Sequence, residues 1–176
     1  IGLFELEMIF SDLAIIERRL ERLGKDLKKV KSPELEMEYE VLRRYRAALE
    51  EERPLRDIEV TMEEEKRVRG FTFLSAKPVL LVLNLGDHDG PRIESVVEEF
   101  RLQKQASMRN VGITAVCGRI ESEIAFLAPE DARMFMEDLG IAGGAVDRII
   151  QSSYKLLGLL SFYTVGEPEA RAWTVP

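Results

Sequence analysis

The sequence predicts an α/β protein in which parallel strands and their helices are joined to an antiparallel helical hairpin. Three observations predict this fold: a long apolar stripe at helical spacing near the N-terminus, a strand–helix–strand order in the middle, and two short strands around a turn near the C-terminus. A chain of 176 residues with 45% hydrophobic content can also bury a core. It suggests one compact domain, or one domain with an appendage.

The hairpin is predicted from apolar residues that alternate at spacings of three and four, which is a heptad seam. Ser32-Pro33-Glu34 then supplies an N-cap, a proline at the first helical position and an early carboxylate, so a second helix is expected there. Its stripe runs to Leu49, and Arg53-Pro54 ends it. A short connection should fold the two helices back antiparallel. The seam of the first helix comprises Leu6, Ile9, Leu13, Ile16, Leu20, Leu23, Leu27 and Val30.

Basic residues gather toward the tip of this hairpin and offer a possible contact for RNA or the ribosome, because grouped cations neutralise phosphates even on an acidic protein. Interspersed acids such as Glu17 and Glu21 support the alternative, which is ordinary ion pairing along the helices. The hairpin is then either a solvated strut or an arm that binds a partner. The basic residues are Arg18, Arg19, Arg22, Lys25, Lys28 and Lys29.

The middle of the chain predicts a parallel strand unit. A capping box at Thr61-Met62-Glu63-Glu64 opens a short helix. Strands over residues 79–83 and 112–117 flank a helix expected over residues 92–107, and a crossover of that length implies parallel, right-handed pairing. Further helical segments are expected over residues 120–127, 129–140 and 146–157. A β-hairpin, 161–165 with 170–175, should follow.

The first of these strands runs into a polar loop that presents Asn84 and Asp87. Ligands of open α/β sheets lie beyond the carboxyl ends of strands, so an amide and a carboxylate there form a candidate site for a nucleotide base. Turn chemistry is the alternative, because such loops are also rich in Asn and Asp. His88 is expected at the surface and Cys117 in the core. We find no phosphate-loop motif, nucleophile elbow or Cys/His cluster, and predict no catalytic residue and no metal ligand.

Charge and composition limit the classes of function. A net charge of −7 argues against general attraction to nucleic acid or anionic lipid. A single cysteine excludes an internal disulfide and fits a reducing compartment, and no apolar run of about 18 residues could span a bilayer. We therefore expect a cytoplasmic protein without membrane contact. The chain opens without methionine and stops directly after an expected strand, so both ends look cut from something longer.

Beyond the hairpin, four segments occur in an order that resembles the YchF-type Obg-like ATPase family: Phe71–Asp87 (FTFLSAKPVLLVLNLGD), Thr114–Leu127 (TAVCGRIESEIAFL), Phe135–Ile141 (FMEDLGI) and Arg148–Pro176. The resemblance implies a P-loop G domain with an inserted hairpin, followed by a β-grasp TGS domain. Residues 1–56 would be the hairpin, 57–147 the C-terminal part of the G domain, and 148–176 the junction and first TGS strands. The phosphate loop would be missing.

The resemblance also assigns a site. Asn84 and Asp87 fall on the base-recognition motif, Leu85 takes the place of the lysine of ordinary GTPases, and Asp87 departs from the family's glutamate. Cys117 and Gly118 occupy the second loop facing the base. The parent protein would hydrolyse ATP or GTP with Mg²⁺. This chain alone would hold no nucleotide and no Mg²⁺. Ribosomes or ribosomal RNA are the implied partners, and the oligomeric state is left open. The alternative function is a non-enzymatic hairpin module that binds RNA or another partner.

Overall fold

The computed structural model describes residues 2–86, 95–100, 102–141, 143–167 and 169–175. The chain forms two compact units, Ile1–Lys77 and Pro78–Pro176, and each is considered by itself. The three-part division implied by the resemblance stays a prediction. None of the described helices is long and apolar enough to cross a membrane.

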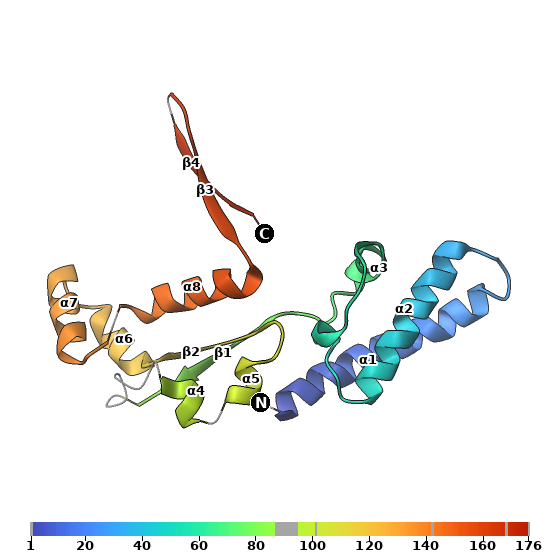
Figure 1. Ribbon diagram of the computed structural model, residues 1–176, viewed down its shortest axis with the longest axis horizontal. Coiled ribbons are helices and arrows are strands. Elements are labelled where there is room, and N and C mark those ends of the chain that lie inside the picture. The colour runs from blue at the N-terminus through green and yellow to red at the C-terminus, as the bar shows by residue number, and fades with distance from the viewer. Residues whose placement is uncertain (1, 87–94, 101, 142, 168, 176) are drawn as a thin grey trace. The chain divides into compact units, whose positions relative to one another are not determined.

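The first unit is built on the expected helical hairpin (Figure 1). Helices α1 (Gly2–Asp26) and α2 (Pro33–Glu50) pack side by side and share one buried seam. The Ser32 hydroxyl accepts the Leu35 N–H, so the predicted N-cap of α2 is confirmed. Each helix contributes every third or fourth residue to the core, as the heptad pattern requires. The predicted seam extends too far, because α1 ends at Asp26 and Val30 is 60% exposed in the connection that follows. The most deeply buried members are Ile9, Ile16, Leu23, Leu42 and Leu49.

Short elements then cover one side of the hairpin. The 3-10 turn η1 (Leu55–Asp57) precedes α3 (Met62–Val68), and η2 (Arg69–Phe71) follows it. The predicted capping box is present: the Thr61 hydroxyl accepts the Glu64 N–H, and the Glu64 carboxylate accepts the Thr61 N–H at 2.9 Å. After η2 the ring of Phe73 packs edge-on against Tyr45 of α2, with ring centroids 5.9 Å apart. The segment after α3 is therefore part of the same core.

A buried carboxylate fixes the end of this segment on α1. Asp12 is fully buried, and its two oxygens accept the Leu74 N–H at 2.9 Å, the Ser75 N–H at 2.7 Å and the Ser75 hydroxyl at 2.7 Å. A buried charge requires this degree of hydrogen bonding to offset its loss of water. No local pattern predicts this contact, because the partners lie 62 and 63 residues apart.

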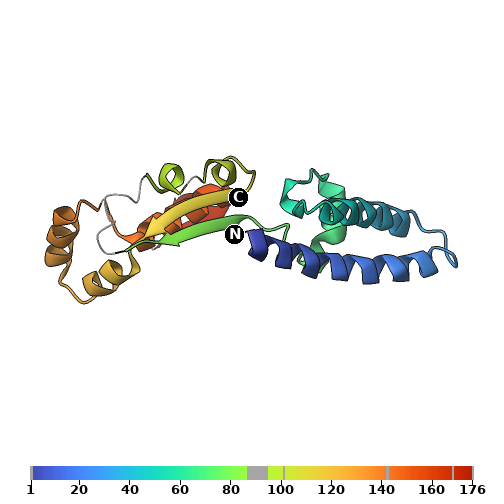
Figure 2. The same ribbon diagram turned by 90° about the horizontal axis from the view of Figure 1, so that it is seen from below.

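The second unit begins with two parallel strands, β1 (Val79–Asn84) and β2 (Val111–Val116), in the register that pairs Asn84 with Val116. Parallel pairing is as predicted. Helix α8 (Ala145–Leu157) packs along both strands (Figure 2). The crossover differs from the prediction of one helix over residues 92–107. The described residues form α4 (Val96–Glu99) and α5 (Gln103–Ala106) instead.

The break between α4 and α5 has a local cause. The Leu102 N–H bonds to the Val97 carbonyl at 2.8 Å, an i to i−5 contact of the kind that closes a helix C-terminus. Leu102 itself is only 9% exposed, so the chain turns its side chain into the core rather than continuing the helix. Hydrophobic pattern alone could not distinguish this kinked path from one helix.

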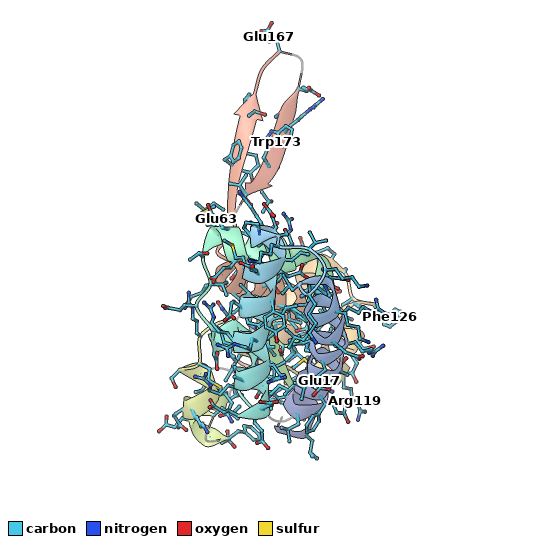
Figure 3. All side chains as sticks on the ribbon, turned by 90° about the vertical axis from the view of Figure 1, so that its right-hand side faces the viewer. Glu17, Glu63, Arg119, Phe126, Glu167 and Trp173 are labelled. Atoms are coloured by element: carbon cyan, nitrogen blue, oxygen red, sulfur yellow. The ribbon has the colours of Figure 1, made fainter. Side chains whose placement is uncertain are left out.

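The remaining elements follow the predicted order with shifted ends. Helix α6 (Gly118–Ile124) begins two residues earlier than expected, and α7 (Pro129–Asp138) begins at the expected proline. The final strands, β3 (Leu160–Val165) and β4 (Ala170–Val175), pair antiparallel as predicted. Trp173, visible on this ribbon in Figure 3, donates its indole N–H to the Thr164 hydroxyl at 2.9 Å. That these strands begin a TGS domain stays a prediction.

Candidate functional site

The candidate site lies where β1 and β2 end together. Because the strands are parallel and Asn84 pairs with Val116, the residues after each strand emerge at the same edge. The pairing extends past β1, since the Leu85 N–H donates to the Val116 carbonyl at 2.7 Å. Two loops distant in sequence, 84–86 and 117–118, are thus brought together.

The two loops are joined by one side chain. The side-chain oxygen of Asn84 accepts the backbone N–H of Gly118 at 3.0 Å. Gly118 opens α6, and the first N–H groups of a helix have no partner within it. Asn84 therefore satisfies one of these donors. Because an N–H can bond only to an acceptor, the contact identifies which end of the Asn84 amide is oxygen, and the other end is an NH₂ donor.

A small hydrophobic cluster supports both loops from below. Cys117 is 1% exposed, and Leu85 packs against the cluster that Cys117 forms with Ile120 and Ile141. The Cys117 thiol also lies 3.5 Å from the Gly86 carbonyl, within reach of a weak S–H hydrogen bond. Cys117 is thus a core residue, as predicted. Leu85 serves packing, a role that the motif position alone did not indicate.

The structure brings together four of the five predicted base-site residues: Asn84, Leu85, Cys117 and Gly118. Asp87 and His88 lie outside the described residues, so the predicted pairing of Asn84 with Asp87 stays a prediction. Arg119 forms an exposed ion pair with Glu123 at 3.4 Å. No group of three or more His, Cys, Asp or Glu residues in the described part of the chain could hold a metal ion.

One residue at this edge was missed by the sequence prediction. The Glu121 carboxylate on α6 accepts the Ala145 N–H at 2.7 Å, in the first turn of α8. The same oxygen lies 3.8 Å from the Arg148 guanidinium, and both side chains are about four-fifths buried. Nothing in the sequence indicated a contact across 24 residues. The sequence predicts only a helical segment for this region, residues 120–127.

The basic hairpin residues divide into two groups. Arg19 forms a two-pronged ion pair with Glu38, at 2.7 and 2.8 Å, and this contact raises the pKa of Arg19. Lys25 pairs with Glu21 at 2.6 Å. These contacts fit the ion-pairing alternative. Within the described chain, the remaining four form no ion pair, and Arg18 donates its guanidinium N–H to the Ala14 carbonyl at 3.2 Å instead. These four are Arg18, Arg22, Lys28 and Lys29.

A shallow groove of about 200 Å³ lies beside Arg22. Its walls come from α1 and η2, so it belongs entirely to the first unit. The stacking of Phe71 on Phe73, with centroids 5.3 Å apart, fixes the aromatic wall. The groove combines apolar and cationic surface. Its lining residues are Ile15, Arg18, Arg19, Arg22 and Phe71.

The fold and this edge define the class: an α/β protein with a polar loop site at the carboxyl ends of its parallel strands, bearing a helical hairpin. No protein-family model matches the chain. A Bacillus subtilis (strain 168) protein named ribosome-binding ATPase YchF is 38% identical over 96% of this chain and 46% of its own length. Its Escherichia coli O157:H7 namesake is 31% identical over 100% of this chain and 47% of its own length.

A solved structure shares the fold. The Schizosaccharomyces pombe YchF GTPase superposes with a TM-score of 0.82 at 20% identity, covering 98% of this chain and 47% of that chain. The predicted α/β fold class and the predicted resemblance to the YchF-type Obg-like family are confirmed. The chain spans about half the length of the curated relatives it matches.

Proposed function

We propose that this chain is the base-recognition part of a P-loop NTPase that hydrolyses ATP or GTP in the cytoplasm and works at the ribosome. The observation that carries the proposal is the 3.0 Å bond between the Asn84 side chain and the Gly118 N–H, which preorganises an amide at a strand end. The similar proteins named ribosome-binding ATPase and GTPase support the same activity.

Asn84 would recognise a purine rather than choose between purines. Its oxygen is engaged by Gly118, so its NH₂ group donates to the ligand. The acceptor that adenine and guanine share is N7. Asn84 can therefore hold either base, and the choice between ATP and GTP would depend on other groups, of which Asp87 is the one that the motif supplies.

The role proposed for the described residues is to position the nucleotide. Phosphoryl transfer to water depends on Mg²⁺ and on groups that cradle the phosphates. Among the described residues there is no group of three or more His, Cys, Asp or Glu that could hold a metal ion. Their contribution is to hold the base, and with it the triphosphate, in one orientation.

The test compares ATP with 7-deaza-ATP, which lacks the N7 acceptor, in the full-length protein. We expect about tenfold weaker binding of the 7-deaza compound, the size of one hydrogen bond. Asn84→Ala should bind both compounds equally. Ser122→Ala, an exposed change on α6, is the control. The proposal fails if the unmodified protein binds ATP and 7-deaza-ATP equally and Asn84→Ala leaves the affinity for ATP unchanged.

The hairpin would supply a second function, contact with RNA or the ribosome. The groove beside Phe71 supports this, because Arg18 and Arg22 flank an aromatic wall on one helix face. Arginine side chains bind phosphate and aromatic rings stack on bases. A hairpin that acts only as a strut would need neither the arginine side chains nor the aromatic wall. Charge reversal at the tip distinguishes the two.

A further inference from the structure

Helix α6 is the element that sets the geometry of the proposed base site. It is seven residues long, and its first residue donates the N–H that orients Asn84. So short a helix has little stability of its own, and contacts from outside must hold it. One such contact is Ile120, which is 4% exposed in the cluster beneath the loops.

The second contact is Glu121. The Glu121 N–H bonds to the Cys117 carbonyl at 3.0 Å, so its backbone belongs to the same first turn as Gly118. Its side chain leaves this turn and reaches the beginning of α8, where it accepts the Ala145 N–H at 2.7 Å. Gly144 at the N-cap of α8 offers no side-chain oxygen, so Glu121 supplies the capping oxygen from another helix.

The surroundings favour a carboxylate at this point. The N-terminus of a helix carries partial positive charge, and Arg148 lies 3.8 Å away. Ala145, the capped residue, is itself 4% exposed, so its N–H would lack water if Glu121 were absent. Because α8 packs along β1 and β2, the contact ties the first turn of α6 to the sheet.

We propose that Glu121 is a positioning residue for purine recognition: by fixing α6 to α8, it holds the Gly118 N–H where that group orients the Asn84 amide. Glu121 does not touch the nucleotide. The inference rests on the proposed function, because it concerns the same base. Without the Glu121 carboxylate, the first turn of α6 is free to shift, and a displacement of a few tenths of an ångström at Gly118 weakens the orientation of Asn84.

The test is the ratio of affinities for ATP and 7-deaza-ATP in the full-length protein. This ratio reports the contact with N7 and is not changed by a general loss of folded protein. Glu121→Ala should lower the ratio by roughly threefold or more, toward that of Asn84→Ala. Glu121→Gln keeps an acceptor for the Ala145 N–H and should restore most of the ratio.

The matched control is Glu123→Ala, which removes a carboxylate from the same helix that pairs only locally with Arg119. It should leave the ratio unchanged. If Glu121→Ala does not fold, Glu121→Asp replaces it, since its carboxylate is one carbon too short to reach Ala145. If folded Glu121→Ala or Glu121→Asp keeps the ratio of the unmodified protein while Asn84→Ala binds both compounds equally, the inference is overturned. If Asn84→Ala also leaves the ratio unchanged, it is the proposed function that fails.

Discussion

Gly118 approaches Asn84 so closely that a Cβ atom at residue 118 would lie 3.1 Å from the Asn84 side-chain oxygen. This is tighter than an ordinary contact, so an added methyl group would push the amide aside. Gly118→Ala should therefore weaken binding of ATP and GTP by roughly threefold to tenfold in the full-length protein. Isothermal titration with each nucleotide measures the effect.

Stability separates this effect from unfolding. Alanine stabilises a helix relative to glycine by about 0.5–1 kcal/mol, and this gain opposes the cost of the close contact between the added Cβ and Asn84. Gly118→Ala should therefore lower the free energy of unfolding by no more than that contact costs. Gly166→Ala is the control, because a Cβ there meets nothing within 4 Å. Equal nucleotide affinity in Gly118→Ala and the unmodified protein would show that the close approach has no role in binding.

Asp12 should be the most sensitive polar position of the hairpin. Both of its oxygens accept hydrogen bonds from Leu74 and Ser75 in a fully buried place. Asp12→Ala leaves these donors without a partner, and the loss should be about 3 kcal/mol in the free energy of unfolding. Asp12→Asn keeps the shape but turns an NH₂ group toward a donor, so it should also destabilise.

Urea denaturation measures both Asp12 variants. The control is Glu17→Ala, an exposed carboxylate on the same helix that points outward in Figure 3 and whose removal should change stability by less than about 0.5 kcal/mol. If Asp12→Asn is as stable as the unmodified chain, one oxygen at residue 12 is enough to maintain the contact with Leu74 and Ser75.

Asp12 also shows what the sequence could predict. The heptad pattern correctly located the hairpin and most of its seam, because each turn repeats the same local requirement. Its last predicted member, Val30, was wrong, because α1 ends at Asp26. Asp12 lies on α1 among the seam residues, yet its burial depends on two residues more than 60 positions away. Similarly, Asn84 and Gly118 were predicted as one site from their motifs, but Glu121 was missed because its contact with Ala145 leaves no local pattern. Local periodicity is readable in sequence, and pairings between distant segments are not.

The capping box of α3 predicts a dependence on pH. The Thr61 N–H, which bonds to the Glu64 carboxylate, lowers the pKa of Glu64, and Arg44 at 2.9 Å lowers it further. A carboxylate whose pKa is lower in the folded state stabilises the fold fully above its unfolded pKa of about 4.3. That contribution is lost as the pH falls through the folded pKa.

Glu64→Gln measures this contribution. The difference in unfolding free energy between the unmodified chain and Glu64→Gln should be largest near neutral pH and should shrink as the pH falls below about 4. Urea denaturation over a pH series gives the difference. A control is Glu63→Gln, an exposed neighbour in the same helix turn. A constant difference at all pH values would contradict the role of the Glu64 charge.

The hairpin tip gives the last prediction. In the described chain, Arg22, Lys28 and Lys29 form no ion pair, so they are available to neutralise phosphates. Reversing all three to Glu should weaken binding of the full-length protein to ribosomes or to single-stranded RNA in low salt. The dependence of log K on log salt should also become shallower, by roughly one unit for each cation that contacts a phosphate. Filter binding or sedimentation over a salt series measures both quantities.

The matched control reverses two arginines of α2 and one that follows this helix, which changes the net charge by the same amount. Their ion pairs are with acids one turn away or two residues away, so their loss leaves the groove intact. If general charge attracts the RNA, this control should reduce binding as strongly as the tip variant, because both carry the same net charge. If the tip makes the contact, only the tip variant should change the slope. If neither variant changes binding, the hairpin is a strut and its cations serve solubility. The three control positions are Arg43, Arg46 and Arg53.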